Sequence, residues 1–115
     1  MLYYYNMSID ADGRTFKALA NPVRRRLLDL LRDNPLTTGA LCEAAPELDR
    51  CTVMQHLKVL EGADLLIVER RGRERWNHLN PVPIHRIHER WIGPFAAQAV
   101  SVLDKLKRDQ EGGRR

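Results

Sequence analysis

The sequence predicts a mainly α-helical fold with one small β-hairpin, and three observations lead to this prediction. Apolar side chains recur at helical spacing through most of residues 12–62. Residues 65–79 are instead rich in β-forming side chains, and Gly72 interrupts this stretch near its middle. Residues 83–110 then return to a helical pattern.

The length of 115 residues suits one domain and is close to the commonest domain size. We place this domain at residues 12–110. A flexible N-terminal arm is expected at residues 1–11, and a disordered tail is expected at residues 111–115.

The first two helices are expected to meet at a proline. The first runs from Asp12 to Ala20 and is broken at Asn21, because a proline disfavours helix in the residue before it. Pro22 can open the second helix, since the first turn of a helix does not need its missing N–H. The second helix is expected to end near Asp33.

Two shorter helices follow, and a turn separates them. Thr37 or Thr38 can cap a helix that ends near Ala45. Asp49 can accept hydrogen bonds from the free N–H groups of the next helix, residues 50–62.

A β-hairpin is expected after this helix. Asp64 can end the helix because aspartate tolerates the left-handed conformation. Residues 65–71 and 74–79 have the composition of strands, and Gly72-Arg73 forms the tip between them.

Two short helices joined by a turn and followed by a hairpin form a winged helix–turn–helix, whose second helix enters the major groove of DNA. At about 100° per residue, Val53, Leu57 and Leu60 share one side of residues 50–62, with His56 at the edge as a packing residue. Glutamine can pair with adenine, threonine with a base or a phosphate, and a methyl or thiol can touch thymine. An ordinary amphipathic surface helix is the alternative, but the order of elements favours DNA contact by Arg50, Cys51, Thr52, Met54, Gln55 and Lys58.

The hairpin tip is the second expected DNA contact. Its arginines are opposed only by Glu69 and Glu74, and a basic tip can reach a minor groove or the phosphates. The alternative is a solvated hairpin that uses charge to block edge pairing. DNA contact is favoured because four arginines are more positive charge than a hairpin needs to block edge pairing. The four are Arg70, Arg71, Arg73 and Arg75.

A third basic cluster, Arg24-Arg25-Arg26, lies at the start of the second helix. These side chains can approach phosphates or form a solvated helix face, and the sequence leaves both interpretations open.

Charge, cysteine content and hydropathy limit the setting in which the chain works. The net charge of +4 favours a polyanionic partner, although many soluble domains are mildly basic. Cys42 and Cys51 form no disulfide framework, so a reducing compartment is expected. No run reaches the ~18 apolar residues of a bilayer span, and the N-terminus lacks the pattern of a signal peptide. We therefore expect a cytoplasmic protein without membrane association.

Three segments resemble the ArsR/SmtB family of bacterial repressors. Residues 16–28 (FKALANPVRRRLL) resemble the opening of that family, and residues 50–60 (RCTVMQHLKVL) resemble its recognition helix. Residues 65–81 resemble its wing and exit, so the match covers about residues 12–92. The resemblance implies a homodimer that binds a palindromic operator and represses nearby genes. Cys51 is a departure, because it stands where proline is common in these relatives.

The chain also departs from the metal-sensing motifs of that family. The thiolate-type motif pairs two cysteines on the third helix, whereas this chain has only Cys42 there. The other common site uses the last helix of both subunits, whereas His85, His88 and Glu89 lie near the start of that helix. His85 and His88 could share a metal at their i, i+3 spacing, but a surface pair is the expected role. We expect no metal and no cofactor; the alternative function is a metal- or thiol-responsive sensor using Cys42/Cys51 or His85/His88.

The closing helical region, residues 83–110, indicates a partner surface. Gly93-Pro94 interrupts it, and the apolar residues beyond follow a spacing of three and four. Such a helix can pack within its own chain or pair with the same helix of a second chain about a twofold axis. We expect the first and last helices to form a homodimer interface from Phe16, Leu19, Trp91, Phe95, Ala99, Val102, Leu103 and Leu106.

The remaining classes of function have less support. We find no nucleophile–base pair, no glycine-rich phosphate loop and no carboxylate cluster, so an enzyme is not expected. A winged helix used only for protein contact stays open as an alternative. The sequence favours a sequence-specific regulator of transcription that binds double-stranded DNA. Repression is favoured over activation by the family resemblance and by the lack of a second domain to recruit polymerase.

Overall fold

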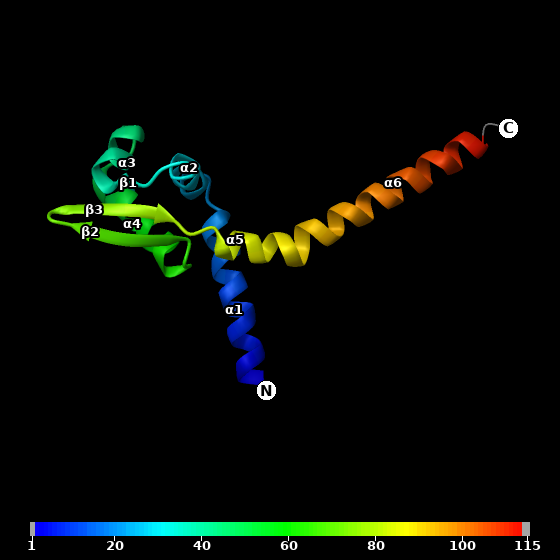
Figure 1. The fold of residues 1–115 in the computed structure, drawn as a ribbon, viewed down its shortest axis with the longest axis horizontal. Helices are drawn as coiled ribbons and strands as arrows, with labels where there is room; N and C mark the ends of the chain where they lie inside the picture. Colours follow the sequence, from blue (N-terminus) through cyan, green and yellow to red (C-terminus); the bar gives the residue numbers. More distant parts are fainter. Residues whose placement is uncertain (1, 114–115) are drawn as a thin grey trace. The chain divides into compact units, whose positions relative to one another are not determined.

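In the computed structural model, residues 2–113 are described, and side chains are described for residues 11–112. These residues form two compact units; the first reaches to Pro83 and the second begins at Ile84. Figure 1 labels the elements in chain order. The first unit contains helices α1 (Leu2–Leu19), α2 (Pro22–Leu30), α3 (Thr38–Ala44) and α4 (Arg50–Gly62), and strands β1 (Leu36–Thr37), β2 (Leu66–Arg71) and β3 (Glu74–Leu79).

The expected starts of α2, α3 and α4 are confirmed. Asn21 caps α2, Thr37 caps α3 and Asp49 caps α4, and each side chain accepts a hydrogen bond from a backbone N–H of the first turn. Pro22 occupies the first turn of α2, where no N–H is needed. Local side-chain chemistry therefore sets where these helices begin.

Two helix boundaries differ from expectation. The structure extends α1 back to Leu2, whereas an arm was expected over residues 1–11; residue 1 lies outside the described part. No proline precedes Pro22, and Gly13 within the helix weakens it without removing a backbone hydrogen bond. The helical span of α2 ends at Leu30 rather than Asp33, because residues 31–34 form a turn and bends ahead of Pro35.

The sheet has one strand more than the expected hairpin. β3 lies between β1 and β2, and all pairs are antiparallel. Leu36 pairs with Asn77, whose buried side chain donates from Nδ2 to the carbonyl of Leu36 and to Oγ1 of Thr38. β1 has only two residues, which is too short to show the alternation that identifies a strand.

The hairpin itself matches the prediction closely. β2 and β3 pair in register from Leu66 with Leu79 to Arg71 with Glu74. Gly72 has φ 63° at the first position of the two-residue tip, the position that favours glycine in this kind of turn. Asp64 has φ 60° and ends α4 as expected.

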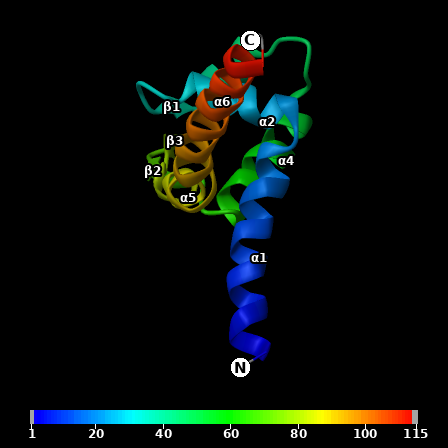
Figure 2. The same cartoon turned by 90° about the vertical axis from the view of Figure 1, so that its right-hand side faces the viewer.

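The core of the first unit lies between its helices and the sheet. Figure 2 shows the C-terminal end of α1 beside α2 and α4, and these three helices contact one another. The apolar side of α4 is buried as expected, with Val53, Leu57 and Leu60 at most 1% exposed. The other buried apolar side chains of this unit include Ala18, Leu27, Leu28, Leu31, Leu41, Ala45, Ala63, Leu65 and Leu66.

The second unit is helical. α5 (Val82–Ile87) leads into it, and a π-helical turn, η1 (His88–Ile92), connects α5 to α6 (Gly93–Gly113). The expected interruption at Gly93-Pro94 takes the form of this turn, in which the N–H of Gly93 donates to the carbonyl of His88. Pro94 has no N–H and crowds the carbonyl of a preceding turn, so a widened turn accommodates it without breaking the helix.

α6 extends to Gly113, whereas a disordered tail was expected from residue 111; residues 114–115 lie outside the described part. Across the residues that the structure describes, no helix combines the length and the apolar character that a bilayer crossing requires.

Candidate nucleic-acid interface

α4 presents two chemically distinct sides. Opposite its buried leucines, Arg50, Cys51, Gln55 and Lys58 are exposed. Met54 is exposed on this side as well, and Thr52 is half-buried beside it. The polar side predicted from the helical spacing is therefore exposed, and its groups donate, accept or carry positive charge.

The N-terminus of α4 is fixed by Asp49. Its Oδ1 accepts from the N–H of Thr52 at 2.7 Å. Hydrogen bonds from Thr52, first its N–H and then its side chain, lower the pKa of Asp49. The carboxylate thus stays charged at the positive end of the helix dipole.

The four arginines of the hairpin tip fall into two groups. Arg71 pairs with Glu69 and lies over the ring of Trp76, with its guanidinium carbon 5.0 Å from the ring centroid. Arg75 pairs with Glu61 of α4. Arg70 and Arg73 are exposed, and the structure shows neither side chain with an ion pair or hydrogen bond to another described residue. Their guanidinium groups are therefore available to an external anion.

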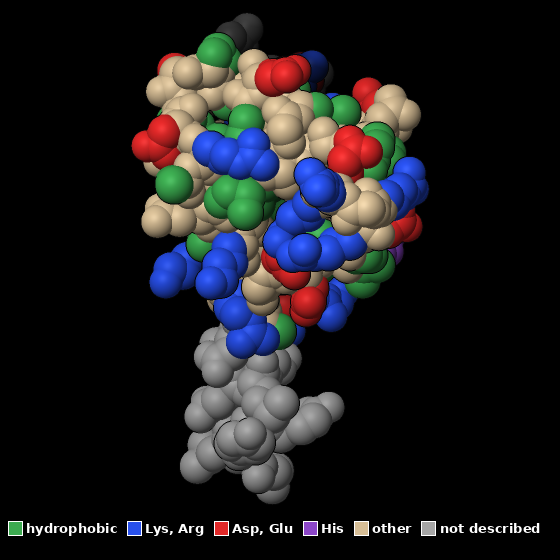
Figure 3. Space-filling model, turned by 90° about the vertical axis from the view of Figure 1, so that its left-hand side faces the viewer, with side chains coloured by type: hydrophobic (Ala, Val, Ile, Leu, Met, Phe, Trp, Pro, Cys, Tyr) green, Lys and Arg blue, Asp and Glu red, His purple; other side chains and the backbone are tan. Residues whose placement is uncertain are grey.

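A cleft of about 320 Å³ joins the hairpin tip to α3 and α4. Figure 3 shows the face toward which the tip points, and Lys and Arg side chains gather there among a few acidic and hydrophobic ones. The lining consists of Thr37, Thr38, Gly39, Arg50, Met54, Arg70, Arg73, Glu74 and Arg75. Sequence reasoning missed Thr37 and Gly39 as part of this surface, because their role there depends on how the start of α3 packs against the hairpin.

A second hollow of about 360 Å³ borders α4. Met54, Gln55, Leu57, Lys58, Glu61 and Arg75 line it. Met54 and Arg75 belong to both hollows, so the exposed side of α4 lies between them.

The arginine run at the start of α2 makes contacts within the chain. Arg24 donates to the carbonyls of Ala18 (2.8 Å) and Lys17 (2.9 Å), and Arg25 donates to that of Leu19 (2.6 Å). These carbonyls lie in the last turn of α1, where no following helical turn satisfies them fully; that of Lys17 also accepts from the N–H of Ala20 at 3.3 Å. The structure thus adds a role within the chain to the two alternatives that the sequence left open, phosphate contact and a solvated face, and Arg25 is exposed while it makes this contact.

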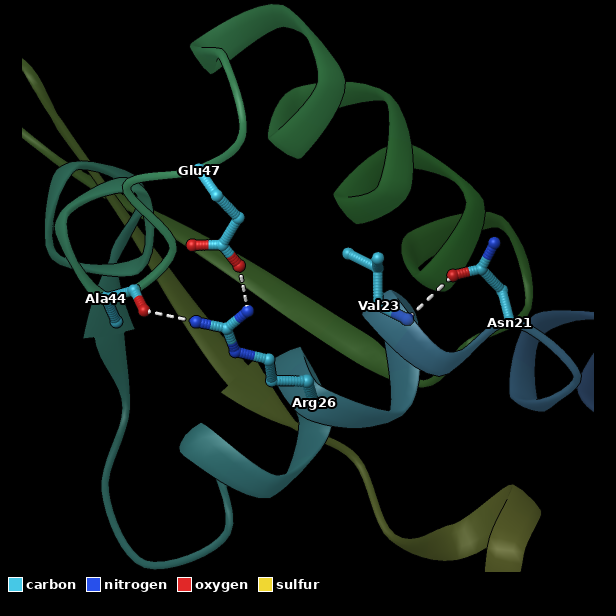
Figure 4. Close-up of polar contacts among 5 residues, drawn as sticks. All are labelled: Asn21, Val23, Arg26, Ala44 and Glu47. Atoms are coloured by element: carbon cyan, nitrogen blue, oxygen red, sulfur yellow. Dashed lines mark hydrogen bonds and ion pairs between the residues drawn. The ribbon is translucent and has the colours of Figure 1, made fainter.

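Arg26 connects α2 to the end of α3 (Figure 4). It donates to the carbonyl of Ala44 at 2.7 Å and pairs with Glu47. The hydrogen bond from Arg26 lowers the pKa of Glu47, and its charge adds to the effect. This contact fixes the turn that leads into α4.

The candidate sensor residues are dispersed. Cys42 is half-buried and Cys51 is exposed; both are free thiols. Nε2 of His85 lies 3.8 Å from a carboxylate oxygen of Glu89, and His88 is exposed. Among residues whose side chains are described, no group of three His, Cys, Asp or Glu could hold a metal ion.

The residues expected at a dimer interface include many exposed apolar side chains. In the second unit Trp91 and Phe95 stack with ring centroids 6.3 Å apart, and both are exposed. Ala99, Val102, Leu103 and Leu106 of α6 are also exposed. In the first unit Phe16 is 47% exposed and Leu19 is half-buried.

Comparison with known sequences finds the same kind of domain. A helix–turn–helix domain family matches residues 19–69. The transcriptional repressor SdpR of Bacillus subtilis is 32% identical over 68 residues, which cover 59% of this chain and 74% of SdpR. The repressor SmtB of Mycobacterium tuberculosis is 38% identical over 66 residues, which cover 57% of this chain but only 48% of SmtB. The chain therefore spans about half the length of SmtB.

Comparison with solved structures gives the same fold. The structure of a possible transcriptional regulator for arsenical resistance is 31% identical, with a TM-score of 0.60, and the match covers 81% of this chain and 92% of the other. An ArsR family transcriptional regulator has a TM-score of 0.64 at 23% identity, covering 83% of this chain and 92% of the other. This second likeness concerns the fold alone.

Proposed function

Because the chain belongs to the ArsR/SmtB-type winged helix–turn–helix transcriptional regulators, we propose that it binds a defined sequence of double-stranded DNA and represses transcription there. The observation that carries this proposal is the common surface of α4 and the hairpin tip. Arg50 of α4 lines the same cleft as Arg70 and Arg73, and the latter two have no ionic partner among the described residues. A helix edge beside free guanidinium groups suits a base-reading element next to a phosphate contact.

The proposal assigns different tasks to the two elements. α4 lies in the major groove, where Gln55 reads a base edge and Arg50, Thr52 and Lys58 contact bases or phosphates. The hairpin tip, which acts as the wing, contacts the backbone or a neighbouring minor groove. Cys51 and Met54 supply apolar contacts.

We further propose that the chain acts as a homodimer on a palindromic operator in the cytoplasm, without catalysis. The exposed apolar side chains of α6 support pairing with a second copy, because a helix this apolar is unfavourable in water. A twofold axis would place the two α4 helices about 34 Å apart, one turn of DNA.

The decisive experiment measures fluorescence anisotropy of two labelled duplexes at two salt concentrations. One duplex carries the DNA upstream of the chain's own gene, and the other carries a scrambled sequence of the same composition. Tight, salt-sensitive binding to the upstream duplex alone, saturating at two chains per site, is the expected result. Equal weak binding to both duplexes would contradict sequence-specific recognition at this site.

Repression needs its own readout. A reporter gene driven by the same upstream DNA should be transcribed less when the chain is present in a purified transcription system. The matched control is Gln55→Ala. Gln55 is exposed on α4, so this substitution should leave the fold intact. Higher transcription with the unsubstituted chain would indicate an activator instead.

A further inference from the structure

Arg75 differs from the other arginines of the wing in its surroundings. Its side chain is 26% exposed, and its Nη2 donates to Oε2 of Glu61 near the C-terminal end of α4. Its Nε is buried and has no hydrogen-bond partner among the described residues. Arg75 therefore points toward α4 and borders both hollows beside it.

Glu61 is an unusual residue for this place. A carboxylate near the C-terminal end of a helix is opposed by the helix dipole. On a surface that faces DNA it would also repel the phosphates. Its ion pair with Arg75 offsets both effects. The pair joins α4 to β3 of the hairpin, and under the proposed function α4 and the hairpin contact DNA separately.

We infer that Arg75 and Glu61 are a positioning pair, which holds the wing at a fixed place beside α4, and that Arg70 and Arg73 carry the phosphate contacts of the wing. This inference rests on the proposed function and differs from the expectation that all four wing arginines contact DNA. Each binding event needs both elements in one geometry, and a wing that is already held loses less freedom on binding.

The substitution Glu61→Gln distinguishes two roles of Arg75, holding the wing and contacting phosphate, because the two roles predict opposite changes in DNA affinity. If Arg75 holds the wing, loss of the pair weakens binding to the upstream duplex, although a negative charge has been removed from a DNA-facing surface. The expected loss is about two- to fivefold, the range that one partly exposed ion pair supports. If Arg75 instead contacts phosphate, Glu61→Gln frees it, binding becomes tighter, and the inference is overturned.

The salt dependence of DNA binding distinguishes an arginine that contacts phosphate from one that positions the wing. Arg73→Gln should reduce the slope of log K against log salt by about one per protomer, because one phosphate contact is lost. Arg75→Gln should weaken binding with little change of slope. A slope change for Arg75→Gln as large as that for Arg73→Gln would overturn the assignment.

Exchanging the two charged residues of the pair provides the matched control. The double substitution Glu61→Arg with Arg75→Glu keeps the net charge and the possibility of an ion pair. It should recover a substantial part of the affinity that Arg75→Glu alone loses, whereas independent effects of the two substitutions would count against the pair.

Amide hydrogen exchange tests the pair without DNA. Exchange over β2 and β3 should be faster in Glu61→Gln and Arg75→Gln than in the unsubstituted chain, while the amides of α2 stay unchanged. Unchanged exchange in the strands would contradict a positioning role. If the unsubstituted chain bound no DNA, the proposed function would fail, while the exchange result would still decide whether the pair holds the wing.

Discussion

Nη1 of Arg24 lies 3.3 Å from Nδ1 of His56, so α2 contacts α4 through the imidazole of His56. An arginine can only donate, and Nδ1 must therefore accept the hydrogen bond in its unprotonated form. The same guanidinium donates to the carbonyls of Lys17 and Ala18 at the end of α1. Arg24 thus joins α1, α2 and α4, and the neutral state of His56 is part of that junction.

This junction predicts that acid destabilises the fold through His56. Burial lowers the pKa of His56 below its ordinary value of 6.5, and the charge of Arg24 lowers it further. A lowered pKa in the folded state means that the unfolded chain binds the proton more readily. The stability from neutral His56 is therefore complete above about pH 6.5 and is lost as the pH falls toward the folded pKa.

The measurement compares urea unfolding of the unsubstituted chain and His56→Gln from pH 7.5 to 5.5. The stability of the unsubstituted chain relative to the variant should fall with pH. His88→Gln is the matched control, because His88 is exposed and lies in the second unit. A difference between the unsubstituted chain and His56→Gln that does not vary with pH would contradict this role.

The cap of α2 gives a second prediction, on stability alone. Oδ1 of Asn21 accepts from the N–H groups of Val23 (2.8 Å) and Arg24 (3.2 Å). Asn21→Ala leaves these donors without the cap and should lower the free energy of unfolding by about 1 kcal/mol. Chemical denaturation measures the change. Asn34→Ala, at an exposed bend, should have a much smaller effect, and equal effects would show that the cap is not responsible.

Much of the first unit could be predicted from the sequence because its signals are local. The caps at Thr37 and Asp49, the helix start at Pro22 and the glycine at the hairpin tip depend on chemistry within a few residues. β1 could not be predicted, since it is held by a buried asparagine about forty positions along the chain. Nor could the partners of the arginines, because Arg75 with Glu61 and Arg26 with Glu47 form only after distant segments pack.

Base recognition by α4 gives a third prediction. Gln55 is exposed on the side of α4 opposite the buried leucines, and its amide can form two hydrogen bonds with an adenine edge. Gln55→Ala should weaken binding to the upstream duplex by about 1–3 kcal/mol and leave binding to the scrambled duplex nearly unchanged. Competition anisotropy with duplexes that vary one base pair at a time measures the effect. Equal losses on both duplexes would assign Gln55 to the backbone instead of a base.

The apolar surface of α6 gives the last prediction, on assembly. Leu103 is 64% exposed in the single chain, and Val102 and Leu106 are exposed near it on the same helix. A twofold interface contains the same residue from both protomers. Leu103→Glu therefore removes two leucine side chains from the interface and adds two charges. Burying one leucine contributes about 1.5–3 kcal/mol, and the dimer dissociation constant should therefore rise at least about 100-fold.

Sedimentation equilibrium of the unsubstituted chain and Leu103→Glu measures this change. Ser101→Glu is the matched control, because it adds the same charge to α6 without removing an apolar side chain. The helical content of Leu103→Glu should stay close to that of the unsubstituted chain, since glutamate is a good helix former. A dimer that survives Leu103→Glu unchanged would place the interface elsewhere, and a monomeric unsubstituted chain at micromolar concentration would remove the twofold arrangement from the proposed function.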